Sequence, residues 1–197
     1  MIPIGKFDKK FFTSGAYKNY KNILAEWIKP VAKRIYKLLG SDSPKKVLDV
    51  GCGFGDLLVE LKNNYNFSVE GVECSSYAIR KSRPSVRRKI KKGSILKLPF
   101  KRDSFDLVVC FDVIYYLTPK ETVRAIKNLI KVSRNYIFFN SIYRHSKDAS
   151  QKHNPDPYRI TVLSKKEYID IFSKSGARLI KKFREENGGE TLIFKKK

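Results

Sequence analysis

The first strong pattern in the chain lies between Tyr17 and Leu39, where hydrophobic residues recur every three or four positions. That spacing puts them on one side of a helix, so it predicts an amphipathic helix with a buried apolar face. Pro30 falls inside the stretch, where a proline bends a helix, and Gly40 follows it, where glycine commonly ends one. We therefore expect one long N-terminal helix.

Short hydrophobic runs then alternate with helical patterns. The expected strands are 46–50, 67–73, 86–92, 105–111, 135–141, 178–184 and 191–195, and the expected helices are 56–65, one beginning at Ser75, 119–131 and 164–176. Such alternation predicts an α/β fold with a mostly parallel sheet and right-handed crossovers. Gly188 and Gly189 separate the last two strands, which predicts a hairpin and therefore one antiparallel strand.

Basic residues greatly outnumber acidic ones: 42 Lys and Arg against 19 Asp and Glu give a formal net charge of +23. Such a field attracts anions such as RNA, DNA and acidic membranes, although an AT-rich genome or a hot habitat also enriches lysine. The densest basic run comprises Arg80, Lys81, Arg83, Arg87, Arg88, Lys89, Lys91 and Lys92. It fits either a solvated helix end and a lysine-protected edge strand, or a patch that contacts phosphates.

The apolar runs are all shorter than the roughly 18 residues of a membrane span, and we find no signal peptide. The three cysteines, Cys52, Cys74 and Cys110, form no C-x-x-C pair. Their odd number argues against a disulfide framework, so small buried residues are expected, with no metal site. These features predict a cytoplasmic protein.

The strongest chemical signal is the run Val47-Leu48-Asp49-Val50-Gly51-Cys52-Gly53-Phe54-Gly55. A buried strand leads into a glycine-rich turn followed by a helix, and ligands of such sheets bind at the carboxyl ends of the strands. Position 56, which would hold the third glycine of a dinucleotide motif, is Asp56, whose charge would repel a pyrophosphate. A phosphate-binding Gly-Lys-Ser/Thr sequence is also missing.

This run resembles the first motif of the class I S-adenosylmethionine (SAM)-dependent methyltransferases. The resemblance continues through Val69 to Ser75, Gly93 to Phe100 and Ser104 to Val108, which are similar to the second, third and fourth motifs. It implies SAM as cofactor, S-adenosylhomocysteine (SAH) as product and a Rossmann-like sheet of seven strands with helices on both faces. The small-molecule branch of the superfamily is the most similar.

The resemblance also implies roles for individual residues. Gly51, Cys52 and Gly53 would wrap the methionine end of SAM, with Asp49 near its ammonium group. Glu73, followed by Cys74, would accept hydrogen bonds from both ribose hydroxyls. Ser94 stands where the family usually has Asp near the adenine amino group, Ile95 would pack beside the adenine ring, and Phe111 would end the fourth strand under the cofactor. The implied cofactor-binding set is Asp49, Gly51, Cys52, Gly53, Glu73, Cys74, Ser94, Ile95 and Phe111.

We expect a single domain over residues 1–197. Its parts would be an N-terminal helical cap (1–45), the SAM-binding core (46–141), a substrate or lid loop (142–163), and a C-terminal helix and hairpin (164–197). The loop is long for a compact domain, which favours a role at the substrate.

Methyl transfer from a sulfonium needs a base only when the acceptor carries a proton at neutral pH. The candidate catalytic residues are Asp112, Tyr116, His145 and His153. Tyr115 follows the same strand as Tyr116. Tyr17 and Tyr20 begin the N-terminal helix, where they would either lie near the cofactor or only pack. Asn154-Pro155-Asp156-Pro157-Tyr158 is similar to a motif of nitrogen methyltransferases, but it follows the wrong strand and carries an extra Asp156, so we discard it.

Three interpretations of function remain. The first is transfer of a methyl group from SAM to a small molecule. The second is methylation of RNA or another nucleic acid, recruited by the positive charge. The third is a non-catalytic module that binds SAM or SAH, prompted by Ser94.

Overall fold

The computed structural model describes residues 4–14, 20–40, 45–144, 156–184 and 190–197. A seven-stranded sheet has the order β3-β2-β1-β4-β5-β7-β6. The strands are β1 (Lys46–Val50), β2 (Ser68–Glu73), β3 (Ile90–Lys92), β4 (Phe105–Phe111), β5 (Ser133–Asn140), β6 (Ala177–Arg184) and β7 (Glu190–Lys196). β7 is antiparallel to both β5 and β6, and the other pairs are parallel. The predicted sheet with one reversed strand is confirmed.

The helices are α1 (Lys9–Thr13), α2 (Tyr20–Leu39), α3 (Asp56–Tyr65), α4 (Ser76–Lys81), α5 (Pro84–Arg87), α6 (Pro119–Val132) and α7 (Lys165–Lys174), with short 3-10 turns at η1 (Ile4–Lys6) and η3 (Ile114–Tyr116). The side chains of Ser75, Thr118 and Ser164 cap α4, α6 and α7, as their positions in the sequence predicted. Gly188 and Gly189, and Tyr17 at the expected start of the first long helix, lie outside the described residues.

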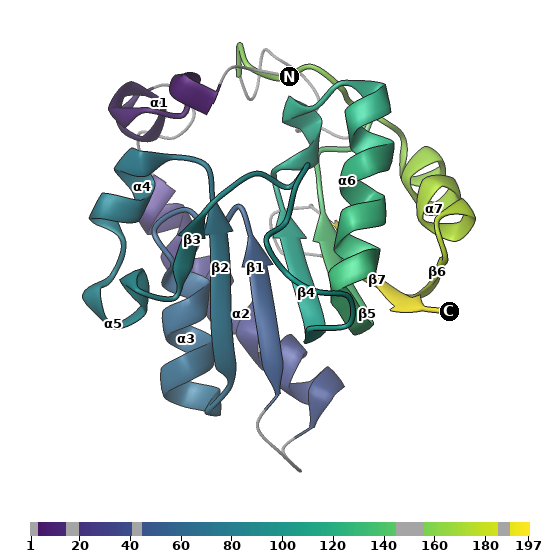
Figure 1. Cartoon of the computed structure of the whole chain (residues 1–197), viewed down its shortest axis with the longest axis horizontal. Coiled ribbons are helices and arrows are strands. Elements are labelled where there is room, and N and C mark those ends of the chain that lie inside the picture. Colours follow the sequence, from purple (N-terminus) through teal and green to yellow (C-terminus); the bar gives the residue numbers. More distant parts are fainter. Residues whose placement is uncertain (1–3, 15–19, 41–44, 145–155, 185–189) are drawn as a thin grey trace.

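Neighbouring residues of the central strands enter two different apolar layers, because successive side chains of a strand point to opposite faces. Leu48 and Val108 pack in the layer that holds α6 and α7, whereas Val47 and Leu107 pack in the layer that holds α2 and α3. Figure 1 shows α6 on the near side of the sheet and α2 on the far side. The sheet is therefore covered on both faces, which leaves the ends of its strands for a ligand.

The expected strand over 86–92 is wrong at its beginning. Only Ile90–Lys92 is a strand, while Pro84–Arg87 forms one helical turn with Pro84 at its first position. Proline has the backbone angle of a helix start. In a strand Arg88 would share the buried face of Val86 and Ile90, but Arg88 is exposed.

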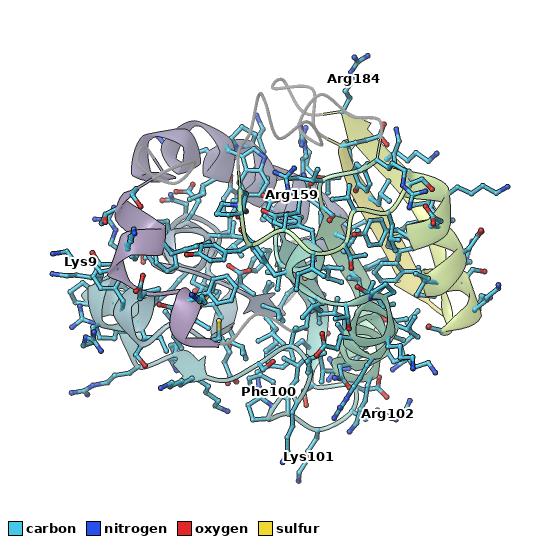
Figure 2. The ribbon with its side chains drawn as sticks, turned by 90° about the horizontal axis from the view of Figure 1, so that it is seen from above. Lys9, Phe100, Lys101, Arg102, Arg159 and Arg184 are labelled. Carbon is cyan, nitrogen blue, oxygen red and sulfur yellow. The ribbon has the colours of Figure 1, made fainter. Side chains whose placement is uncertain are left out.

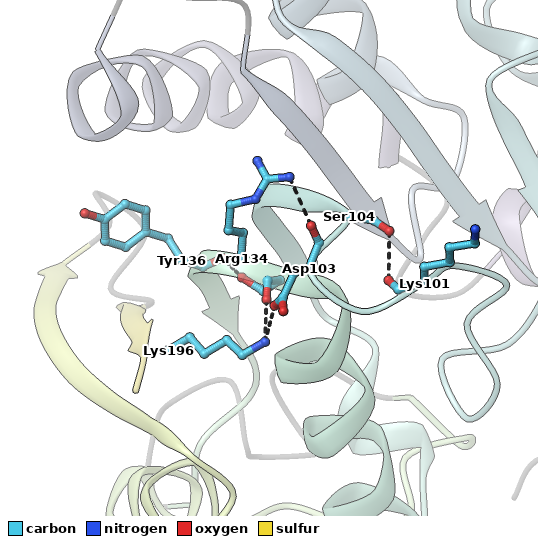
Figure 3. Close-up of polar contacts among 7 residues, drawn as sticks. Lys101, Asp103, Ser104, Arg134, Tyr136 and Lys196 are labelled. Atoms are coloured by element: carbon cyan, nitrogen blue, oxygen red, sulfur yellow. Dashed lines mark hydrogen bonds and ion pairs between the residues drawn. The ribbon is translucent and has the colours of Figure 1, made fainter.

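Polar contacts fix the C-terminal strand at the opposite end of the sheet from the ends of β1 and β2 (Figure 3). The Lys196 ammonium contacts the Asp103 carboxylate and donates to the Ser133 carbonyl at 2.9 Å. Arg134 Nη2 donates to the Asp103 carbonyl at 3.1 Å. These contacts join the loop before β4 to β5 and β7, so they stabilise the frame and leave the opposite end open for chemistry. In the described part of the chain, every helix is too short or too polar to cross a membrane.

Candidate active site

The turn after β1 depends on glycine. Gly51, Gly53 and Gly55 have φ angles of +80°, +52° and +77°, which glycine adopts with little strain. The Gly51 amide donates to the Val72 carbonyl at 2.7 Å, and this bond ties the turn to β2. A Cβ atom on Gly51 would lie 2.3 Å from Cγ2 of Val113. The turn therefore has no room for a side chain at Gly51, and its backbone stays accessible.

Glu73, the last residue of β2, joins the same turn. Its Oε2 accepts from the Gly53 amide at 3.0 Å, and its Oε1 accepts from the Ser75 amide at 2.7 Å. A carboxylate has about four lone-pair positions, so capacity remains for a ligand beside these two amides and the Cys74 thiol, which also hydrogen-bonds Glu73. Glu73 thus holds the glycine turn against the end of β2, a role that the sequence did not predict, and retains the capacity to accept from a ligand.

Asp49 lies buried in β1 beside Glu73 and is only 6% exposed. Burial, and secondarily the charge of Glu73, raises the pKa of Asp49 to about 7. Among the described residues, no lysine or arginine forms an ion pair with Asp49. Two acidic groups therefore share a buried site without a cation, and a positively charged ligand would stabilise their ionised forms.

The thiols of Cys52 and Cys74, the two cysteines of the predicted site, are unreactive, so only their backbone groups would contact a ligand. Cys52 is buried, and its Sγ would lie 2.7 Å from a Cβ on Gly71, so its side chain points into β2. Burial raises the pKa of the Cys52 thiol well above its usual range. Burial, with the charge of Glu73, raises the pKa of Cys74 to about 12. Both therefore stay protonated at neutral pH, as small structural residues do.

The remaining predicted cofactor residues lie on either side of the turn. Ser94 follows β3, and its Oγ accepts from the Leu96 amide at 3.2 Å. Ile95 is buried, and its carbonyl accepts from Asn128 Nδ2 at 3.0 Å. The Phe111 ring packs on the α2 side, with its centroid 4.9 Å from that of Trp27. Contacts of Ser94, Ile95 and Phe111 with a cofactor stay predictions.

An aromatic layer, which the sequence did not predict, lies next to the glycine turn. We define it as Phe7, Phe11, Phe12, Tyr115, Tyr116 and Tyr158. Figure 1 shows that α1, which carries Phe11 and Phe12, lies above the sheet near α4. The Phe12 ring lies 5.1 Å from that of Phe54 in the glycine turn, and the Phe11 ring lies 5.9 Å from that of Tyr158. The layer therefore joins the glycine turn to the segment after β5.

Asp156 secures the far side of this layer. Tyr116 donates its hydroxyl to Asp156 Oδ2 at 2.8 Å, and the Tyr158 amide donates to Oδ1 at 2.9 Å. The Tyr115 carbonyl also accepts from the Ile160 amide at 2.8 Å. Seen from above, Arg159 of this segment lies over the middle of the molecule (Figure 2). Asp156 and the residues that follow it thus have a structural role, because they attach residues 156–160 to η3.

Known proteins resemble the chain in sequence. Residues 47–135 match a family described as a methyltransferase domain. Norajmaline N-methyltransferase of Rauvolfia serpentina is 25% identical over 130 residues, covering 61% of this chain and 44% of that protein. The O-methyltransferase resE of Aspergillus sclerotiorum is 25% identical over 103 residues, covering 49% of this chain and 38% of that protein. The chain thus spans less than half the length of these two relatives.

The fold comparison agrees. Magnesium protoporphyrin IX methyltransferase from Synechocystis PCC 6803, in a structure with bound SAH, matches with a TM-score of 0.76 and 14% identity. The match covers 96% of this chain and 98% of that one. Residues 47–135 of this chain thus match the methyltransferase domain family, and the chain has the fold of class I SAM-dependent methyltransferases. The resemblance that the four sequence motifs show is thereby confirmed.

The observed site fits SAM. The ligand carries an ammonium and a sulfonium, and the methyltransferase domain presents buried Asp49 and Glu73 with no paired cation among the described residues. A Cβ on Gly51 would meet the Val113 side chain, so the turn requires glycine at this position. Glu73 retains acceptor capacity, which suits a ribose hydroxyl. Asp56 lies beside the turn, but it pairs with Arg83 at 2.9 Å and is thereby partly neutralised.

The candidate catalytic residues of the methyltransferase domain lie in different places. Asp112 is exposed just after β4 with a φ of +56°, and its amide donates to the Asn140 carbonyl at 3.2 Å. Tyr116 is buried in the aromatic layer, and Tyr115 is beside it. His145 and His153 lie outside the described residues, and so do the side chains of Tyr17 and Tyr20.

Proposed function

We propose that this chain transfers a methyl group from SAM to a small-molecule acceptor with apolar or aromatic character. The aromatic layer is the observation that carries this proposal. Phe12 contacts the glycine turn through Phe54, and Phe11 contacts Tyr116 and Tyr158 on the other side. An acceptor beside this layer would meet apolar rings, which favour binding of an apolar molecule and exclusion of water.

The names of the relatives support this choice. One relative acts on norajmaline and one structural neighbour on magnesium protoporphyrin IX, and neither acceptor is a nucleic acid. One relative is an N-methyltransferase and another an O-methyltransferase. Nitrogen and oxygen acceptors are therefore both consistent with this domain.

The chain's own residues would chiefly bind and orient the reactants. Bound SAM supplies a methyl group on a sulfonium, which is reactive without further activation. Asp49 would pair with the ammonium group and Glu73 with the ribose, which fixes the direction in which the methyl group points. Effective catalysis then requires an acceptor atom held in line, about 3 Å from the methyl carbon.

The two described catalytic candidates would have different roles. Asp112 is exposed just past β4, so it is the proposed base for an acceptor that must lose a proton. Tyr116 donates its hydroxyl to Asp156, and it therefore holds the aromatic layer in place rather than moving a proton.

A methyl-acceptor screen tests the proposal. Labelled SAM is incubated with the protein and cell extract, which is separated into a small-molecule fraction and an RNA fraction. We expect label in small molecules, and no label when Glu73→Gln replaces the wild type. Label in RNA, lost after ribonuclease treatment, would favour the nucleic-acid function that the charge of +23 suggests. SAM binding without transfer to any fraction would favour a non-catalytic module.

A further inference from the structure

A long stretch of the chain next to the cofactor site lacks acidic residues altogether. Between Glu73 and Asp103 the sequence contains no Asp or Glu. Its basic residues are Arg80, Lys81, Arg83, Arg87, Arg88, Lys89, Lys91, Lys92, Lys97, Lys101 and Arg102. The stretch covers α4, α5 and β3, and Figure 1 shows these three elements together at one edge of the sheet.

The basic side chains of residues 80–92, which we call the β3-edge surface, all face solvent. The buried residues of this segment are Ser82, Val86 and Ile90, so its apolar side chains are inside. The large apolar side chains that are exposed in the described part of the chain are Tyr36, Ile160 and Ile180. The β3-edge surface is therefore charged without being hydrophobic.

Few of these charges are neutralised within the protein. Arg83 pairs with Asp56 at 2.9 Å, and Lys91 pairs with Glu70 at 3.2 Å. Arg80, Lys81, Arg88, Lys89 and Lys92 form no ion pair with any residue in the part of the chain that the structure describes. Several cations at one edge thus repel one another, and an external anion would relieve that repulsion.

The opposite edge of the sheet shows that edge protection does not explain this density. β6 is also an edge strand and also carries lysines, which discourage pairing with other chains. There, however, the acidic residues Glu167 and Asp170 of α7 and Glu190 of β7 lie among the basic ones. Three acids of neighbouring elements therefore lie beside the basic residues of the β6 edge. At the β3 edge residues 74–102 contain no acid, and the neighbouring acids Asp56 and Glu70 pair with Arg83 and Lys91.

The β3-edge surface leads directly to the cofactor turn. β3 pairs with β2, with Lys92 opposite Glu73, and the Gly93 amide donates to the Glu73 carbonyl at 3.0 Å. Beyond the loop, Lys101 and Arg102 extend outward into solvent (Figure 2). An anionic chain on this edge would lie beside the site rather than inside the aromatic layer.

We propose that the β3-edge surface binds the phosphate backbone of nucleic acid, independently of sequence. A row of unpaired cations matches a row of phosphates, and such contacts supply most of the sequence-independent affinity for nucleic acid. The surface has no exposed aromatic ring on which bases would stack. It also lacks the exposed apolar residues with which a surface inserts into a lipid membrane. This docking goes beyond the proposed methyl transfer and does not depend on it.

The test compares two variants of equal charge. The edge variant replaces Arg80, Lys81, Arg88 and Lys89 with Gln, and the control variant replaces Lys166, Lys174, Arg178 and Lys182 with Gln. All eight side chains are exposed. The control residues lie on α7 and β6. Fluorescence anisotropy follows binding of a labelled, mixed-sequence single-stranded RNA of about 20 nucleotides as the salt concentration is raised.

We expect the edge variant to lose at least about tenfold in affinity, with the slope of log affinity against log salt less steep by about 0.7 for each lost phosphate contact. The control should lose less than about threefold, and SAM affinity should stay unchanged in both. Equal losses in the two variants would show that the overall charge attracts RNA, and would overturn the proposal. Absence of RNA binding, with or without binding to phosphatidylserine vesicles, would overturn it as well.

Discussion

The glycine turn and the aromatic layer are neighbours in the fold but are held together differently. The turn is built from backbone: positive φ angles, a bond to the Val72 carbonyl and amides bound by Glu73. The layer is built from side chains of three segments far apart in the sequence, joined by ring contacts and by the bond between Tyr116 and Asp156. Substitution should therefore abolish the turn's function outright, whereas it should weaken the layer gradually.

The largest effect is expected at Gly51. Gly51→Ala must adopt a φ near +80° and bring its Cβ within 2.3 Å of Val113, so we expect a loss of stability of about 3 kcal/mol or more and no detectable SAM binding. Chemical denaturation and calorimetry measure these two effects.

Gly176→Ala is the matched control, because Gly176 also has a positive φ, +101°, but open space around it. It should lose only about 1–2 kcal/mol. Adding Val113→Ala to Gly51→Ala should restore part of the stability. Equal costs at Gly51 and Gly176 would contradict the close packing of the turn.

A smaller but still large effect is expected at Glu73. Glu73→Gln keeps the size of the side chain but has only one oxygen acceptor, so it cannot accept from both the Gly53 and Ser75 amides. An unsatisfied buried donor costs about 1–3 kcal/mol. We expect SAM to bind at least tenfold more weakly, with the melting temperature lowered. Unchanged SAM affinity would remove Glu73 from the site.

Substitution of Asp49 should change SAM affinity and protein stability in opposite directions. Its raised pKa means that the folded, ligand-free protein keeps this proton up to about pH 7, while the unfolded chain releases it near pH 4. The contribution of Asp49 to stability is therefore greatest below pH 4 and is lost as the pH rises to about 7.

Asp49→Asn removes that loss, because the amide cannot ionise. At pH 8 the ligand-free variant should therefore be more stable than the wild type by about 2 kcal/mol. The gain is not larger because burying the polar amide also costs free energy. Its SAM affinity should fall at the same time. Thermal melting with and without SAM measures both. A variant that is less stable at pH 8 would contradict the unpaired, buried state of Asp49.

The smallest effect is expected in the aromatic layer. Tyr116→Phe removes the hydroxyl that Asp156 accepts and should cost about 1–2 kcal/mol. SAM affinity should change less than about twofold, while KM for the acceptor should rise severalfold. A loss of SAM affinity equal to that of Glu73→Gln would erase the distinction between the two regions.

The contrast between the glycine turn and the aromatic layer also explains which parts of the site could be predicted from the sequence. Asp49, the glycines and Glu73 lie in short local motifs, and the periodicity of β1, β4 and α6 revealed the sheet. The helix over Pro84–Arg87 was mistaken for a strand, because a single turn contains too few residues to reveal its period. The aromatic layer could not be predicted, because Phe11, Tyr116 and Tyr158 meet only after the sheet has formed.

The most direct test of the acidic, glycine-lined site is the number of protons exchanged when SAM binds. Calorimetric titrations near pH 7, in buffers of different ionisation heat, give that number for the wild type and for Asp49→Asn. If a cationic ligand ionises Asp49, the wild type releases about half a proton more than the variant. Equal proton exchange and equal affinity in the two proteins would contradict the assignment of this site.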